Sequence, residues 1–137
     1  MSLVIDTNIL FYFIAKVEPF FKHSHAILEA EVELVAPDIW RPEFLNALWV
    51  ASRLGAMDEN ELINYLPLAA NIIDRTVPAD RIWTDALQLA VKTGHPPYDT
   101  LFVALAQKEK TLLVTFDKRI LEIFPGIAKR PDEILRK

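Results

Sequence analysis

Short apolar runs alternate with longer helical patterns along this chain of 137 residues. We predict strands at 3–5, 34–36 and 112–115, which are mostly apolar, at the short segment 75–77, and at the weaker segment 127–129. The helical patterns cover about 8–15, 19–31, 38–54, a stretch that begins at 58, 79–93, 98–108 and 118–124. Such alternation is typical of an α/β layered fold with a mostly parallel sheet, in which ligands bind beyond the carboxyl ends of the strands.

The ends of these elements are predicted from turn and capping residues. Pro19 is expected to open the helix 19–31, and Pro37 to stop the second strand. Asp38 and Asp58 are expected to cap helix starts with their side chains. Gly94 is expected to end the helix 79–93.

The length and composition favour one compact domain in a reducing compartment. A chain of 137 residues with 52 % hydrophobic residues can bury a single core. Cysteine is absent, which excludes disulfides and thiolate sites and favours an intracellular protein. The longest apolar stretch, 9–15, is far below the roughly 20 residues that cross a bilayer. We therefore expect no membrane association and a cytoplasmic location.

Four acidic residues stand where predicted strands or helices meet loops: Asp6, Glu43, Asp99 and Asp117. A carboxylate beside an apolar segment is costly to desolvate unless it meets a cation or a donor. If the strands are parallel, the four can meet in one cleft, where they would repel one another without a counter-ion. A hard divalent cation such as Mg²⁺ prefers oxygen ligands. The set therefore points to metal-dependent phosphodiester chemistry.

Single members of this set also have ordinary structural explanations. Asp99 could be a helix cap and Asp117 a turn residue. No histidine is expected to serve as a ligand. His23 and His25 would lie on opposite helix faces. His95, in the segment Gly-His-Pro-Pro just before Asp99, could touch substrate but is expected to be an ordinary loop residue.

The net charge of −4 argues against a protein that binds nucleic acid mainly through bulk electrostatics. It does not exclude an enzyme whose metal ions supply the local positive charge. Basic residues occur in small groups, and Lys118 and Arg119 directly follow Asp117. These two could be solvated surface residues, or phosphate contacts on the rim of an acidic centre.

Four segments, spread over nearly the whole chain, combine these acids with characteristic neighbours. They are 6–8 (Asp-Thr-Asn), 42–48 (Pro-Glu-Phe-Leu-Asn-Ala-Leu), 98–106 (Tyr-Asp-Thr-Leu-Phe-Val-Ala-Leu-Ala) and 113–117 (Leu-Val-Thr-Phe-Asp). In this order they resemble the four motifs of PIN-domain proteins, and most closely those of the small VapC-like toxins of toxin–antitoxin pairs. The resemblance implies one nuclease domain over 1–137, with three α/β/α layers around a sheet of about five strands.

The resemblance also implies an activity, that of a Mg²⁺- or Mn²⁺-dependent endoribonuclease. Asp6 and Asp99 would be the main metal ligands, and Glu43 would orient or deprotonate the attacking water. Asp117 would complete the site or hold a second metal.

Supporting residues and partners follow from the same resemblance. Thr7, Asn8 and Thr115 match positions that support the site through hydrogen bonds. An RNA substrate, an antitoxin and a homodimer are the expected partners. The aromatic residues 11–13 could contribute a hydrophobic surface for a second subunit or an antitoxin helix, or they could pack in the core.

Two other functions remain open from the sequence. A receiver-like signalling domain would use a phosphoacceptor Asp6 with Thr115, but it leaves Glu43 and Asp99 without a role. A non-catalytic PIN-like binding module is the second alternative, although all four acids are present.

Overall fold

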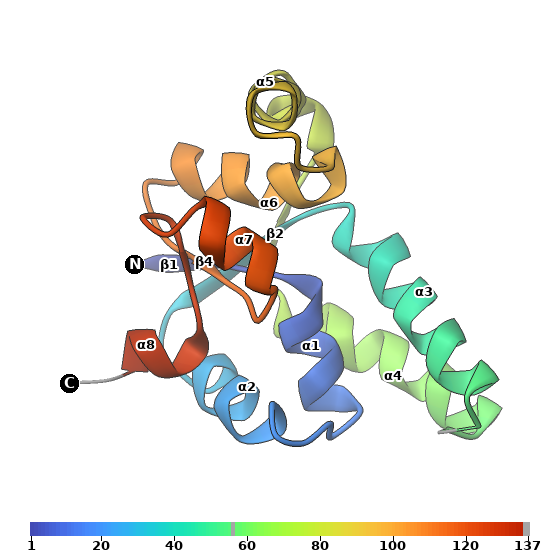
Figure 1. Ribbon diagram of the computed structural model, residues 1–137. Helices are drawn as coiled ribbons and strands as arrows, with labels where there is room; N and C mark the ends of the chain where they lie inside the picture. The colour runs from blue at the N-terminus through green and yellow to red at the C-terminus, as the bar shows by residue number, and fades with distance from the viewer. Residues whose placement is uncertain (56, 136–137) are drawn as a thin grey trace.

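The computed structural model describes residues 1–55 and 57–135 (Figure 1). In this part of the chain, five strands form one parallel sheet in the order β3–β2–β1–β4–β5. They are β1 Ser2–Ile5, β2 Glu33–Pro37, β3 Arg75–Val77, β4 Leu113–Val114 and β5 Ala128–Lys129. Each lies where an apolar run predicted a strand, so the predicted parallel α/β sheet is confirmed.

Helices cover both faces of the sheet and make three layers. They are α1 Thr7–Ile14, α2 Phe21–Leu28, α3 Trp40–Arg53, α4 Glu59–Ile72, α5 Trp83–Thr93, α6 Pro97–Lys108, α7 Lys118–Ile123 and α8 Pro131–Leu135, with a 3₁₀ turn η1 at Ala79–Arg81. α6 packs on the sheet with α5 outside it, α1 and α2 lie on the other side, and α3 runs beside α4 (Figure 1). No helix in the described ranges is long and apolar enough to cross a bilayer.

Burial on both faces explains why the strands read as unbroken apolar runs. Leu3, Val4 and Ile5 of β1 are all buried, as the central position of that strand requires. α6 buries five consecutive residues, 102–106, because it lies between the sheet and α5. The core therefore fixes the positions of two elements that carry the acids. β1 ends directly before Asp6, and the first turn of α6 contains Asp99.

The aromatic residues 11–13 pack within the chain. Tyr12 stacks on Phe20 with ring centroids 4.4 Å apart, and Phe13 stacks on Phe21 at 5.8 Å. These pairs join α1 to α2. Two of the three aromatic residues at 11–13 therefore pack against α2 and its N-cap within the chain, which reduces the surface that this segment could offer to a second subunit.

Several predicted ends were wrong because tertiary contacts override local signals. α2 begins at Phe21 rather than Pro19, whereas β2 ends at Pro37 as predicted. Asp38 does not cap α3; its Oδ1 accepts a hydrogen bond from the Ala79 amide, which ties β2 to the end of β3. Asp58 stands at the N-cap of α4 but makes no side-chain capping bond.

Two further elements differ in extent. The predicted helix 79–93 is divided into the 3₁₀ turn and α5, and it ends at Gly94 as expected, with φ of 75°. α8 was not predicted.

The strand order places a topological switch between β1 and β4. The chain builds outward from β1 to β2 and β3, then returns to the other side of β1 with β4 and β5. Ligands in such sheets bind beyond the carboxyl ends of the strands at the point of reversal. Asp6 directly follows β1, and Thr115 and Asp117 follow β4. A receiver-like sheet has the order 2-1-3-4-5, so the topology does not match that alternative.

Candidate active site

Asp6 is the buried centre of the site. It is the N-cap of α1, in an extended conformation, and its Oδ1 accepts a hydrogen bond of 2.8 Å from the Thr7 amide. The Thr115 hydroxyl donates to Oδ2 over 2.7 Å, from the end of the neighbouring strand. Only 7 % of Asp6 is exposed. Two short bonds from two elements fix this carboxylate at the sheet edge.

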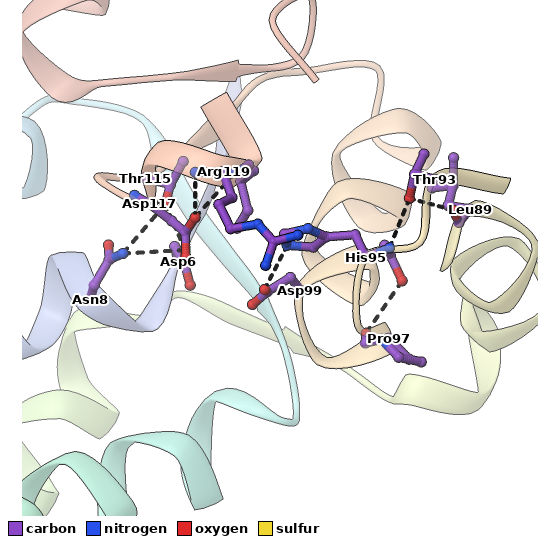
Figure 2. A network of polar contacts seen from close by, with 12 residues as sticks. Asp6, Asn8, Leu89, Thr93, His95, Pro97, Asp99, Thr115, Asp117 and Arg119 are labelled. Carbon is purple, nitrogen blue, oxygen red and sulfur yellow. Dashed lines mark hydrogen bonds and ion pairs between the residues drawn. The ribbon is translucent and has the colours of Figure 1, made fainter. Parts of the chain in front are cut away.

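Thr115 also connects the first carboxylate to the fourth. The Asp117 amide donates to the Thr115 hydroxyl over 3.0 Å. Asp117 is the N-cap of α7, and its Oδ1 accepts from the Arg119 and Ile120 amides at 2.9 and 3.1 Å. Figure 2 shows Asp6, Thr115 and Asp117 gathered where the two strands end. Asp117 thus has a capping role in addition to any role in chemistry.

Glu43 reaches the site from the first turn of α3. The Thr7 hydroxyl donates to Glu43 Oε1 over 2.7 Å, a contact between residues 36 positions apart. Thr7 therefore touches two of the four acids, through its amide to Asp6 and through its hydroxyl to Glu43.

Asp99 reaches the site from the first turn of α6 and is not the cap of that helix, which is Pro96. Its Oδ2 lies 2.8 Å from His95 Nε2 (Figure 2). His95 lies in a loop, as the sequence predicts, but its contact with Asp99 was not predicted. The signal that could have indicated it is the position of His95 four residues before one of the acids.

The four carboxylates lie around one open cleft of about 980 Å³. Thr7 and Asn8 line it as well, together with apolar residues of α1 and α3 such as Phe11 and Val50. Thr115 lies behind Asp6 and is fully buried. The sequence-predicted site residues are thus brought to one place from β1, α3, α6 and β4.

The charges in this cleft are arranged unfavourably in the absence of a cation. The pKa of Asp6 is raised to about 7, mainly by burial and further by the charges of Glu43 and Asp99, against the hydrogen bonds from Thr115 and Thr7. Burial also raises the pKa of Glu43 and of Asp99, and the Asp99 charge adds to the effect on Glu43. Perturbed carboxylates in a cleft are typical of functional sites.

The donor set suits a hard divalent cation. All the candidate ligands are oxygens, and Asn8 Oδ1 is a buried acceptor in the cleft without a hydrogen-bond partner among the described residues. A water bound to a metal could donate to such an atom. Within the described ranges, no three His, Cys, Asp or Glu side chains come together closely enough to enclose an ion. Mg²⁺ does not require this, because it is usually held by one or two carboxylates and keeps several waters.

Replacing Thr115 by Val should destabilise the metal-free protein by about 1–3 kcal/mol, since Asp6 and the Asp117 amide each lose a partner. The loss should be larger at pH 8 than at pH 5. The Thr115 bond favours the charged form of Asp6, and that form dominates only above its folded pKa of about 7. Urea unfolding at the two pH values measures this.

Thr111→Val provides the matched control for that experiment. The Thr111 hydroxyl bonds to the Ser2 carbonyl at the opposite end of β1, away from the carboxylates. Its cost should be independent of pH. Equal pH dependence for both variants would show that Thr115 does not act on the Asp6 charge.

Comparisons with known proteins agree with the fold. The model of the PIN domain family matches residues 3–124. Ribonuclease VapC3 of Pyrobaculum aerophilum is 30 % identical over 129 residues, which cover 93 % of this chain and 98 % of that protein.

Solved structures share the fold at lower identity. The crystal structure of PAE2754 from Pyrobaculum aerophilum has a TM-score of 0.73 and 22 % identity, and the match covers 98 % of this chain and 87 % of that one. VapBC2 from Rickettsia felis, solved with a DNA fragment from its promoter, has a TM-score of 0.65 and 16 % identity, with coverage of 95 % and 98 %.

Proposed function

Because the chain belongs to the PIN domain family, we propose that it is a VapC-like ribonuclease that cleaves RNA phosphodiester bonds with Mg²⁺ or Mn²⁺ and acts as the toxin of a toxin–antitoxin pair. The relative with 30 % identity is a ribonuclease by name, and it matches this chain over nearly its whole length. We also propose that residues 1–137 form a single nuclease domain in the cytoplasm.

One observation carries the proposal. Four acids from four separate segments line one cleft, and the pKa of Asp6 is raised to about 7, mainly by burial and also by the charges of two of the others. A fold that needed these residues only as caps would have no reason to bring their charges together. A divalent cation would reverse the penalty, since it favours the ionised form of each carboxylate.

Each acid has a distinct role in this proposal. Asp6 and Asp99 would hold the metal, which supplies an acidified water and offsets charge at phosphorus. Glu43 would orient the attacking water and accept its proton, and burial raises the pKa of Glu43 in the metal-free cleft. The Thr7 hydroxyl keeps Glu43 Oε1 in place. Asp117 would complete the site or hold a second metal.

Lys118 and Arg119 are the proposed phosphate contacts. Both are exposed at the start of α7, next to Asp117. The Arg119 charge opposes the rise in the pKa of Asp99, which indicates that the guanidinium lies near the cleft, and its side chain extends toward Asp99 in Figure 2. Contacts of this kind would bind the RNA backbone without reading its sequence.

A protein antitoxin is the proposed partner. The support is the family and the fold shared with solved toxin–antitoxin complexes, among them the Rickettsia felis pair. A homodimer remains a prediction. An exposed apolar row on α5, formed by Trp83, Leu87 and Val91, offers a surface for it, because these residues lie four apart on one helix face.

The experiment that tests the proposed function is metal-dependent cleavage of RNA by the purified chain. We expect a single-stranded RNA labelled at one end to be cut in Mn²⁺ or Mg²⁺, to stay intact in excess EDTA, and to be cut again when Mn²⁺ is restored. Equal cleavage in EDTA would contradict the metal role. No cleavage of total RNA in either metal, together with tight binding of a partner protein, would favour a non-catalytic module instead.

A further inference from the structure

His95 is a buried imidazole next to the site, outside the set of four acids. Its side chain is 2 % exposed, and its ring meets the Phe124 ring edge-on, with centroids 6.4 Å apart. It lies between the end of α5 and the start of α6. The proposed function gives this residue no role.

The imidazole makes one hydrogen bond, and that bond goes to Asp99. Nε2 lies 2.8 Å from Asp99 Oδ2, while Nδ1 is buried and has no hydrogen-bond partner among the described residues. A carboxylate can only accept, so Nε2 carries the proton of this hydrogen bond. The ring is therefore oriented by its bond to Asp99 and by packing, with no other polar contact.

The loop that carries His95 holds the ring in this orientation. Gly94 ends α5 in the left-handed region, where a residue without Cβ is favoured, and turns the chain toward α6. The His95 amide donates to the Thr93 hydroxyl over 3.3 Å. Pro96 and Pro97 follow and fix two further φ angles. These features fix the backbone at His95, and burial of the ring restricts the rotation of its side chain.

Packing alone does not account for a histidine at this position. A leucine or phenylalanine could fill a space beside Phe124 without burying a nitrogen that lacks a partner, which opposes folding. Unlike leucine or phenylalanine, the imidazole supplies a hydrogen-bond donor to Asp99 Oδ2. That bond fixes Oδ2 at the edge of the cleft, while Oδ1 does not take part in it.

We propose that His95 is a positioning residue, which fixes the Asp99 carboxylate through the Nε2–Oδ2 hydrogen bond so that its other oxygen is set to bind the divalent metal. This inference rests on the proposed function, because it assigns Asp99 as a ligand. Removing a residue that hydrogen-bonds to a metal ligand commonly weakens metal binding by about 10- to 100-fold.

Three variants of the full chain test the inference. His95→Leu removes the donor and keeps an apolar side chain in the space, and His95→Gln restores a side-chain N–H near the position of Nε2. Thr100→Val is the matched control, since it removes a buried 2.7 Å bond to the Ala86 carbonyl from the residue next to Asp99. Mn²⁺ affinity is measured from the signal of free Mn²⁺ in electron paramagnetic resonance, and thermal stability is measured on the same samples.

We expect His95→Leu to bind Mn²⁺ about 10- to 100-fold more weakly than the wild type, and His95→Gln to stay within about threefold. Thr100→Val should lose stability without losing Mn²⁺ affinity. The role of His95 would be overturned if His95→Leu bound Mn²⁺ as tightly as the wild type. It would also be overturned if folded His95→Leu and His95→Gln lost the same amount of Mn²⁺ affinity. Neither result would contradict the proposed function. Absence of Mn²⁺ binding by the wild type would overturn the proposed function, and the inference with it.

A measurement on the wild-type protein covers the case in which His95→Leu does not fold. In ¹⁵N-labelled protein, the buried Nε2–H proton should exchange slowly and give its own resonance, identified by its loss in His95→Gln. Addition of Mg²⁺ should shift this resonance along the same saturation curve as metal binding. A resonance that is unaffected by saturating Mg²⁺ would overturn the inference.

Discussion

Asp6→Asn and Asp99→Asn are each expected to lower the rate of RNA cleavage by about 10³-fold or more. Each change removes one negative charge from the proposed metal site, and metal-based stabilisation of the reaction is worth several kcal/mol, where about 1.36 kcal/mol is tenfold in rate. Asparagine keeps the shape of the side chain and an acceptor for the Thr7 amide in the case of Asp6. A labelled RNA and a quenched time course in Mn²⁺ give the two rates.

Asp85→Asn is the matched control for these variants. Asp85 is exposed in the first turn of α5 and does not line the cleft. Its removal changes the net charge by the same amount, and cleavage should stay within about twofold of the wild type. A similar loss of activity in Asp85→Asn would indicate that total charge, and not the site, determines the rate. Full activity in Asp6→Asn would contradict its role as a ligand.

The same Asp6→Asn change is expected to stabilise the metal-free protein at pH 8. In the wild type, burial raises the pKa of Asp6 from its ordinary value of 3.8 to about 7 in the folded protein. The stabilising contribution of its protonated form is complete below about pH 4 and is lost as pH rises to about 7. At 1.36 kcal/mol per pKa unit, the full loss is bounded by about 4 kcal/mol. Asparagine is neutral at every pH and avoids it.

Urea unfolding in EDTA at pH 4 and pH 8 measures this effect. We expect the wild type to lose stability between these values by more than Asp6→Asn does, and the variant to be the more stable protein at pH 8 by about 1–3 kcal/mol. Saturating Mn²⁺ should reverse the order, because it stabilises only a protein that binds it. A wild type that is more stable than Asp6→Asn at pH 8 without metal would show that its hydrogen bonds outweigh its buried charge.

Much of the fold was readable from the sequence because the central strands, β1 and β4, are apolar and buried on both faces. A run such as Leu3-Val4-Ile5 has few alternatives, and its parallel neighbours could be expected to end at the same edge as Asp6. The order of the strands in the sheet could not be predicted from these segments, because it depends on long-range pairing such as that of β1 with β4. α8 was not predicted, although its start carries a readable signal, a proline followed by two acids at 131–133.

The parts of the site that were not predicted involve side chains whose partners lie in other elements. Asp38 looks like a cap in sequence but bonds to Ala79 across two strands. The hydrogen bond between Thr7 and Glu43 joins two helices. His95 was read as a loop residue, which it is, but the turn after Gly94 directs its ring at Asp99. Local sequence patterns indicate which bonds a residue is able to make. Which partner it meets depends on the tertiary fold, which those patterns do not specify.

The hydrogen bond between Thr115 and Asp6 joins residues 109 positions apart in the chain. Asp6 therefore acquires this partner only in a chain that has already paired β4 with β1. A fragment that stops before β4 should lack both this hydrogen bond and the placement of Asp6 beside Asp117. The carboxylate cluster is thus a property of the complete sheet and not of its first strand alone.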